Sequence, residues 1–231
     1  MEKPIQSGRT VQGIERVDDT VRRAIGPRSA FVHELLRHLE ERAFAGAPKY
    51  LGLDSLGRES LSYIPGDVPP DLGSFSAEQL VRAAHLLCEL HDATVTFDGR
   101  GAQEIVCHGD ASPCNCVFQD GGPIAFIDFD AAHPGQRRDD VGYAAWLWLD
   151  LGNEDLAPAE QGRRVGEFVA AYGKMEIVDA LPAILDAQTE LSQRRGAPSP
   201  TREWAQHCLQ WARQHHVALA SGLASMRQTA F

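Results

Sequence analysis

The sequence contains no apolar run of the length that a membrane-spanning helix needs, so we expect no membrane-integral segment. Its first ten residues, MEKPIQSGRT, lack the apolar stretch of a secretory signal, and we therefore expect a cytoplasmic protein. Cysteine is scarce and its count is odd, which indicates free thiols in a reducing compartment. The five cysteines are Cys88, Cys107, Cys114, Cys116 and Cys208.

Positively charged residues are also few. The sequence contains 22 Lys and Arg residues but 32 Asp and Glu residues, so its formal net charge is −10. Such a surface repels nucleic acid and anionic lipid and suits cationic small molecules. An acidic balance also simply keeps a protein soluble. We expect no nucleic-acid or membrane partner and keep a cationic substrate open. With 43% apolar residues, the 231-residue chain can bury a substantial core.

The N-terminal part is predicted to be rich in strands. Residues 11–24 resemble a β-hairpin that turns at Asp18-Asp19, and two further strands are expected within 49–54 and 59–64. Between these pairs, Ser29 is placed to cap a helix. Its apolar residues recur at helical spacing at Val32, Leu35, Leu36 and Leu39.

The stretch PGDVPPDLG, residues 65–73, is rich in Pro and Gly and is typical of a linker. It divides the chain into a small lobe, residues 1–65, and a larger, mostly helical lobe, residues 66–231. In the second lobe, Ser76 and Gln79 form the pattern of a capping box that opens a helix running to about His91.

Short strands are then predicted at 105–107, 116–118 and 124–128, with QDGGP as a hairpin turn between the last two. From Val141 onward the pattern indicates three or four helices. The last of these carries a stripe that we interpret as core packing: Trp204, Cys208, Trp211 and His215.

One polar motif lies among these short strands. His108, Asp110 and Asn115 form H-x-D-x4-N, the spacing of the kinase catalytic loop, and Asp128 follows thirteen residues later at the end of an apolar strand. Phosphoryl transfer from ATP needs one carboxylate at the attacking hydroxyl. It also needs hard oxygen ligands that hold Mg²⁺ on the phosphates. The hairpin turn would bring Asp128 back toward Asn115, so the three side chains can share one cleft.

The same stretch also contains Cys114 and Cys116, which raises the alternative of a zinc or redox site. Zinc ligands usually come in pairs separated by two or more residues, and two thiolates alone cannot complete a tetrahedral site. Small, buried and inert thiols are therefore the expected role of these cysteines.

The segment HGDASPCNCVF…IAFIDFDAAHPGQRRDDVGYAAW resembles the core of the aminoglycoside phosphotransferase and choline kinase-like family. The resemblance implies an α+β, two-lobed protein-kinase-like fold. It implies that Asp110 is the catalytic base or orients the substrate hydroxyl, and that Asn115 and Asp128 ligate Mg²⁺. It further implies that His108 supports the loop and that Asp140 braces it from the start of a helix.

The glycine-rich phosphate loop of protein kinases, G-x-G-x-x-G, is absent, and so is the strand lysine that contacts the phosphates. Arg23 is the predicted substitute for that lysine, with Glu34, Glu40 or His33 as its helix partner. Adenine is expected to meet the backbone of the strand that joins the lobes, at Ser62, Tyr63 and Ile64.

These features predict a Mg²⁺- and ATP-dependent phosphotransferase that acts on a hydroxyl of an aminoglycoside-, choline- or sugar-like molecule. Because the glycine loop and the lysine are missing, a non-catalytic kinase-like module that binds nucleotide or ligand is the alternative hypothesis.

Overall fold

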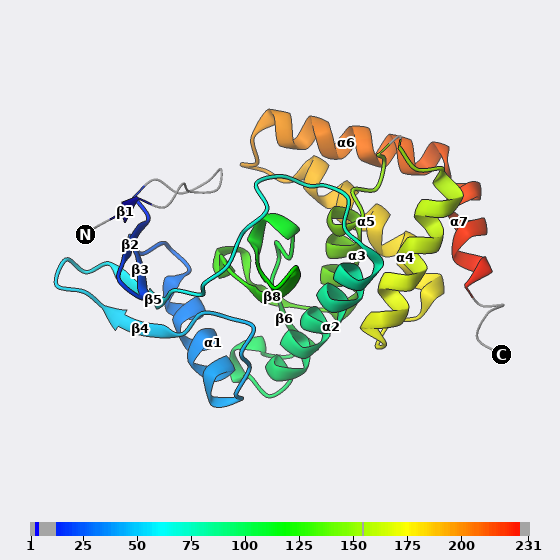
Figure 1. Ribbon diagram of the computed structural model, residues 1–231. Helices are drawn as coiled ribbons and strands as arrows, with labels where there is room; N and C mark the ends of the chain where they lie inside the picture. The colour runs from blue at the N-terminus through cyan, green and yellow to red at the C-terminus, as the bar shows by residue number, and fades with distance from the viewer. Residues whose placement is uncertain (1–2, 5–12, 154, 227–231) are drawn as a thin grey trace.

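The computed structural model describes residues 3–4, 13–153 and 155–226. The chain forms a small lobe of strands with one helix and a larger helical lobe, and the two lie side by side (Figure 1). The predicted two-lobed α+β architecture is therefore confirmed. Residues 11–12 of the predicted hairpin, and most of the N-terminal decapeptide, lie outside the described residues. None of the described helices combines the length and apolarity required to span a bilayer.

The small lobe is built on a five-stranded antiparallel sheet with the order β1-β2-β3-β5-β4. The predicted hairpin is present, with its turn at Asp18-Asp19. The central strand β3 pairs with β5 so that Arg23 lies opposite Glu59. The strands are β1 (Lys3–Pro4), β2 (Glu15–Val17), β3 (Thr20–Arg23), β4 (Tyr50–Leu53) and β5 (Glu59–Ser62).

Helix α1 (Ser29–Glu41) packs its predicted apolar face inward, because Val32, Leu35, Leu36 and Leu39 are all 1% exposed. The prediction that Ser29 caps this helix is wrong. Ser29 is already its first residue, and its hydroxyl accepts a hydrogen bond from the backbone N–H of Gly26 at 2.8 Å. That bond stabilises the turn before the helix rather than the helix end.

The linker after β5 pairs with the larger lobe, because Asp67 and Phe118 exchange two backbone hydrogen bonds of 2.9 and 2.7 Å. Helix α2 (Ala77–Thr94) follows with the predicted capping box: Ser76 accepts from the N–H of Gln79, and the Gln79 side chain accepts from the N–H of Ser76. The buried face of α2 joins that of α1 in one continuous apolar core that extends through both lobes.

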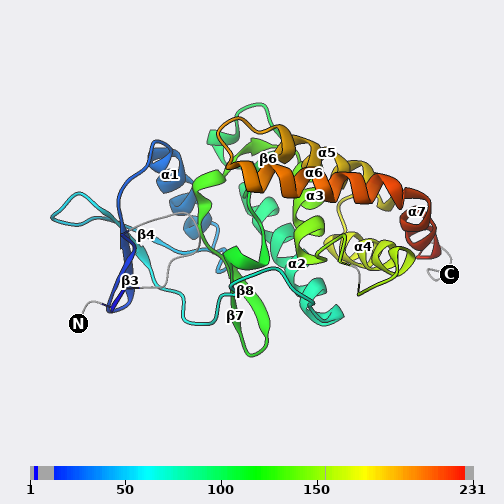
Figure 2. The same cartoon turned by 90° about the horizontal axis from the view of Figure 1, so that it is seen from above.

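Two small two-stranded antiparallel sheets lie between the small lobe and the helical end of the larger lobe (Figure 2). One pairs β6 (Ile105–Cys107) with β9 (His133–Gly135), and the other pairs β7 (Cys116–Gln119) with β8 (Gly122–Phe126). The third predicted strand, 124–128, is shifted: β8 ends at Phe126, two residues before Asp128. Short 3-10 turns occur at Asp98–Arg100, Pro113–Asn115, Phe129–Ala131 and Ile177–Asp179.

The C-terminal part contains five described helices, one more than the upper end of the prediction. The first begins at Arg137, before the expected Val141, and the stripe that contains Trp204 lies on α6, with a further short helix after it. The helices are α3 (Arg137–Trp148), α4 (Pro158–Tyr172), α5 (Ala180–Gln193), α6 (Ser199–Gln214) and α7 (His216–Ser225).

Candidate active site

The predicted catalytic loop leaves the end of β6, passes through a 3-10 turn and enters β7. The Asn115 side-chain amide donates to the backbone oxygen of Asp110 at 3.0 Å and to its carboxylate Oδ2 at 2.8 Å. These two bonds close the loop from Asp110 to Asn115. Asp110 and Asn115 therefore meet as the motif spacing predicts.

Gly109 shapes this loop, because its backbone has φ +77°, in the left-handed region that favours glycine. A β-carbon at this position would clash with the backbone oxygen of Ala131. The loop thus passes close to the segment that follows Asp128, and no other residue type fits there without movement.

His108 connects the loop that contains Asp110 with the segment that leads to Asp128. Its side chain is fully buried, and its Nδ1 accepts from the N–H of Asp110 at 3.3 Å while its Nε2 donates to the carbonyl of Ile127 at 3.1 Å. Burial lowers the pKa of His108, which favours this neutral tautomer. The N–H of Ile127 in turn donates to the Asn115 carbonyl at 2.9 Å. The segment before Asp128 is therefore held against the catalytic loop.

Asp140, in the first turn of α3, forms hydrogen bonds with the backbone of the loop. Its carboxylate accepts from the N–H groups of His108 and Gly109, at 2.7 and 3.0 Å, and contacts Nε2 of His91 at 3.0 Å. Burial acts to raise the pKa of Asp140, but these hydrogen bonds, first that of His91, lower it below its ordinary value. The bracing contact that the family resemblance implies is thus present in the geometry.

Two further contacts of α3 were not predicted from the sequence. The Tyr143 hydroxyl donates to Oδ1 of Asp110 at 3.0 Å, and the Trp148 indole N–H donates to the Ala111 carbonyl at 2.9 Å. Burial, followed by the charge of Asp110, raises the pKa of Tyr143 well above its ordinary value, so the hydroxyl stays a donor. The spacing of Tyr143 from Asp140, one helical turn, is the only sequence signal for this role.

Asp128 follows the end of β8 and takes a left-handed backbone conformation, with φ 62° and ψ 65°. Its side chain is 36% exposed. Because the Asn115 side-chain nitrogen is used by Asp110, the amide oxygen is the atom left for a cation. This donor set, one carboxylate and one amide oxygen, fits Mg²⁺. The described residues contain no group of three or more His, Cys, Asp or Glu side chains arranged for a metal ion.

Arg23 reaches from the small lobe into this region. Its guanidinium donates to Oδ1 of Asp128 at 3.3 Å and binds Asp130 through two hydrogen bonds of 3.1 and 2.5 Å. Burial acts to lower the pKa of Arg23, but Asp130 and then Glu59 raise it, so the charge is retained. Arg23 therefore lies beside the predicted metal ligand, where a phosphate-binding cation would be needed.

The predicted helix partners of Arg23 are not its partners. Arg23 Nε donates instead to Glu59 on β5 at 2.5 Å, and His33 of α1 contacts the other oxygen of Glu59 at 2.5 Å. His33 thus acts through Glu59 rather than on Arg23 directly. Glu59 is 1% exposed and faces Arg23 across the sheet. Sequence analysis missed this residue because the pairing register of β3 and β5 is not visible in the sequence.

The predicted adenine-binding residues lie on the strand that leads from the sheet to the linker. The N–H of Ser62 donates to the Lys49 carbonyl at 2.9 Å, and the N–H of Tyr63 donates to the Asp19 carbonyl at 2.8 Å. Among the described residues, the N–H of Ile64 has no such backbone partner. Of the three predicted N–H groups, Ile64 is therefore the one available to a base.

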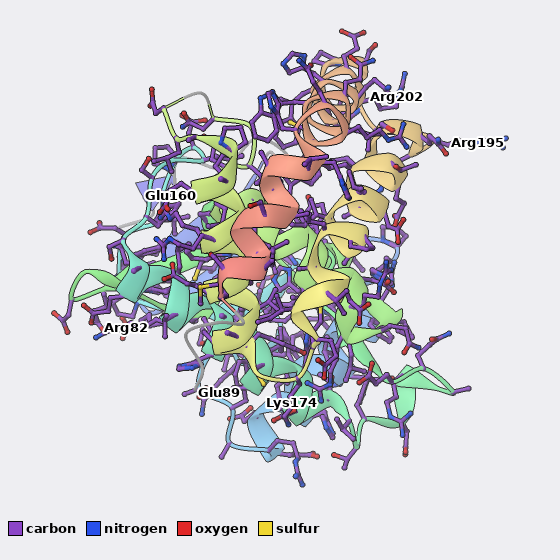
Figure 3. All side chains as sticks on the ribbon, turned by 90° about the vertical axis from the view of Figure 1, so that its right-hand side faces the viewer. Arg82, Glu89, Glu160, Lys174, Arg195 and Arg202 are labelled. Atoms are coloured by element: carbon purple, nitrogen blue, oxygen red, sulfur yellow. The ribbon has the colours of Figure 1, made fainter. Side chains whose placement is uncertain are left out.

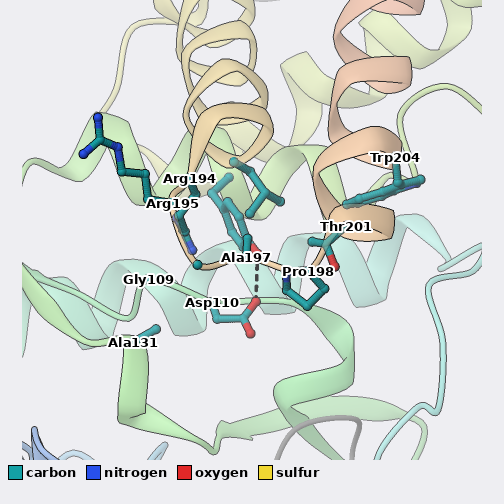
Figure 4. Close-up of a pocket in the computed structure, with 12 residues that line it drawn as sticks. Gly109, Asp110, Ala131, Arg194, Arg195, Ala197, Pro198, Thr201 and Trp204 are labelled. Atoms are coloured by element: carbon teal, nitrogen blue, oxygen red, sulfur yellow. Dashed lines mark hydrogen bonds between the residues drawn. The ribbon is translucent and has the colours of Figure 1, made fainter.

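A cavity of about 490 Å³ opens next to Asp110. Figure 4 shows Gly109, Asp110 and Ala131 on one wall and the end of α5, with Arg194 and Arg195, on the other. Trp204 completes the cavity from α6. It is 37% exposed, so the interpretation of its stripe as pure core packing is wrong for this residue, although Cys208 is buried.

The cysteines of the motif form no disulfide. Burial raises the pKa of Cys116 to about 12, so its thiol is protonated and unreactive at neutral pH. Cys114, two residues before β7, is partly buried.

The chain resembles known proteins in sequence and in fold. A family model described as phosphotransferase enzyme family matches residues 99–181, which include the whole predicted catalytic loop and Asp128. The trifolitoxin immunity protein of Rhizobium leguminosarum bv. trifolii is 30% identical over an alignment of 255 positions that covers 94% of this chain and 96% of the relative.

Solved structures show the same fold at low identity. A macrolide 2′-phosphotransferase from Brachybacterium faecium is 13% identical, with a TM-score of 0.54 and coverage of 91% of this chain and 87% of its own. An aminoglycoside phosphotransferase from Streptomyces rimosus, in complex with ADP and streptomycin, is 16% identical, with a TM-score of 0.52 and coverage of 72% and 86%.

Proposed function

Because the chain belongs to the phosphotransferase enzyme family, we propose that it transfers the γ-phosphoryl group of ATP to a hydroxyl of a small molecule with the help of Mg²⁺. The observation that carries the proposal is the convergence of Asp110, Asn115 and the segment before Asp128 around one loop. The cavity beside Asp110 gives the acceptor a place to bind.

Asp110 is the proposed catalytic base. Its two carboxylate oxygens accept one hydrogen bond each, from Tyr143 and Asn115, which fixes the group and leaves further lone pairs for a substrate hydroxyl. The hydroxyl proton passes to Asp110 as the hydroxyl oxygen forms a bond to the γ-phosphorus. The bond between that phosphorus and the bridging oxygen breaks, and ADP leaves.

Asn115 and Asp128 are the proposed ligands of Mg²⁺, which would neutralise charge on the ATP phosphates. Arg23 is the proposed phosphate contact in place of the family's lysine, because its guanidinium already lies among carboxylates at this site. An arginine can bind phosphate through its planar fork. Ser62, Tyr63 and Ile64 are proposed to border the adenine, with the Ile64 N–H as the donor.

The name of the curated relative suggests a biological setting. That relative is named for immunity to trifolitoxin, and two solved structures of the same fold are antibiotic phosphotransferases. We extend the proposal accordingly: the acceptor is a toxic small molecule that loses its effect when it is phosphorylated.

The proposal is tested with purified protein, Mg²⁺, ATP and acceptor panels of aminoglycosides, amino-alcohols and sugars. Asp110→Asn should lower kcat by about 100-fold or more while nucleotide binding persists, because a positioned base contributes about 10²–10⁴-fold to rate. Asp128→Asn should abolish the Mg²⁺-dependent thermal shift with ATP. A wild-type protein that shows no Mg²⁺–ATP shift and no turnover contradicts the proposal.

The second candidate is a kinase-like module that binds ligand without transferring phosphate. The contact of Arg23 with both Asp128 and Asp130 favours it, because this arginine occupies oxygen atoms that a metal would need. Nucleotide binding with no turnover in any acceptor panel, and the same result for Asp110→Asn, would support this candidate over the first.

A further inference from the structure

The charged residues of the cavity beside Asp110 are mostly positive, whereas the net charge of the whole chain is negative. The chain carries a formal net charge of −10, yet the charged residues that line the cavity are Asp110, Arg194 and Arg195. Asp110 is the proposed base, and its oxygens already accept bonds from Tyr143 and Asn115. Among the described lining residues, no second carboxylate is available to pair with an amine of the acceptor.

Arg194 is the cation best placed to meet a ligand. It is the first residue after α5. Its positive charge acts to lower the pKa of Tyr143, whose hydroxyl donates a hydrogen bond to Asp110. Arg194 forms an ion pair of 3.0 Å with Glu190, which lies one helical turn earlier on α5. The side chains of Arg194 and Glu190 are 42% and 72% exposed. Exposed pairs of this kind are weak and screened by salt, so the guanidinium can exchange Glu190 for a ligand anion at little cost.

Arg195 differs from its neighbour in direction. Its side chain projects from the end of α5 into solvent, away from the body of the molecule (Figure 3). It therefore belongs to the rim of the cavity rather than to its floor. Arg194 is the residue expected to set the charge preference.

The other side of the cavity is aromatic and apolar. Trp204 stacks on the buried Trp146, with ring centroids 4.7 Å apart and planes 15° apart, so its indole is held in place. Leu191 and Pro198 border the same space. A fixed aromatic face beside a guanidinium suits a ligand that has both an apolar part and an anionic group.

We propose that the acceptor is a hydroxylated small molecule that carries a carboxylate and an apolar face, with Arg194 binding the carboxylate and Trp204 the apolar part. This inference rests on the proposed phosphotransferase function and names the substrate class for its acceptor site. It replaces the cationic acceptor that the overall charge had left open, because the local charge at the cavity has the opposite sign.

The test uses three probes that differ in charge: N-benzoyl-serine, its uncharged methyl ester, and the polycation kanamycin. Binding is measured by calorimetry with Mg²⁺ and a non-hydrolysable ATP analogue present, and turnover by ADP release with ATP. N-benzoyl-serine should bind at least about tenfold more tightly than its ester, since charged hydrogen bonds contribute more than neutral ones.

Arg194→Gln should remove that preference without changing the affinity for the ester. Arg163→Gln is the matched control, because Arg163 also forms a partly exposed ion pair one helical turn away, with Glu167 on α4, and lies outside the cavity. Arg194→Glu should reverse the preference toward kanamycin. A preference that survives Arg194→Gln, or no binding of the carboxylate probe by protein that still binds nucleotide, overturns the inference.

Failure of the phosphotransferase proposal has a different signature. In that case Mg²⁺ and ATP analogue cause no thermal shift, and no probe releases ADP, whatever the order of probe affinities. A normal nucleotide shift with the wrong order of probes contradicts the acceptor assignment alone.

Discussion

At the scale of single residues, Tyr143 offers a direct test of how Asp110 is positioned. Its hydroxyl donates to Oδ1 of Asp110 at 3.0 Å, while Asn115 holds Oδ2. Tyr143→Phe removes one of the two restraints on the carboxylate and leaves the ring in place. We expect kcat to fall about tenfold, since hydrogen bonds to charged groups contribute about 1.5–3 kcal/mol, with KM for ATP unchanged.

Initial rates at saturating Mg²⁺ and ATP measure this effect, and Asp110→Asn serves as the reference for complete loss of the proposed base. A Tyr143→Phe enzyme with unchanged kcat and a raised acceptor KM would show that the hydroxyl binds substrate rather than orienting Asp110.

The contact that the sequence predicted and the structure contains is between residues close together in the chain. Asp110 and Asn115 belong to one loop of fixed spacing, so their contact follows from the motif. Glu59 and Arg194 could not be found this way. Glu59 meets Arg23 because of a strand register, and Arg194 reaches the cavity because of where α5 ends. Both depend on long-range packing that a single sequence does not display.

At the scale of one element, helix α3 holds the proposed catalytic loop in place through Asp140. Removing this buried carboxylate leaves two loop N–H groups and His91 without their acceptor. We expect Asp140→Ala to lower the free energy of unfolding by about 3–5 kcal/mol, the range measured when one partner of a buried ion pair is removed. Urea unfolding followed by circular dichroism measures it.

Asp139→Ala is the matched control, because Asp139 is adjacent on the same helix but 54% exposed, and its contact with Arg138 is long, at 4.0 Å. It should change stability by less than about 0.5 kcal/mol. If both variants lost the same free energy of unfolding, the loss would come from helix propensity and not from the buried hydrogen-bond network.

The same network predicts the effect of acid. The pKa of Asp140 is lower in the folded than in the unfolded state, so the unfolded state binds the proton more readily. The stability from Asp140 is therefore complete above the ordinary pKa of about 3.9 and is lost as pH falls below it. Asp140→Ala should unfold with a weaker dependence on pH in that acidic range than wild type.

Errors in the element predictions have local physical causes. Ser29 has the right residue type for a helix cap, but its hydroxyl bonds backward to Gly26 and the helix starts one residue earlier than a cap would allow. The stripe from Trp204 onward keeps helical spacing up to His215, yet the helix ends there, and α6 and α7 are separate helices. Periodicity reports a buried face and does not report where the backbone turns.

At the scale of the whole molecule, Arg23 joins the two lobes. It lies in the sheet of the small lobe and forms two hydrogen bonds with Asp130 in the larger lobe, where Asp130 is 53% exposed. A second link is the bond from Arg28 to the Ala132 carbonyl at 2.5 Å. Because both links meet the segment after Asp128, they set how closely the sheet approaches the catalytic loop.

Asp130→Asn weakens the first link without leaving a buried charge unpaired, since Glu59 still holds Arg23. We expect global stability to change by less than about 1 kcal/mol, because Asp130 is 53% exposed and the buried Arg23 keeps its bond to Glu59. Amide hydrogen exchange in β3 and β5 should nevertheless become about fivefold faster, because exchange reports the local opening of the lobe interface. Asp139→Asn removes an equally exposed carboxylate away from that interface and should leave these rates unchanged. If Asp130→Asn exchanges as slowly as wild type, the lobes are held by their shared apolar core between α1 and α2, and Arg23 serves the nucleotide alone.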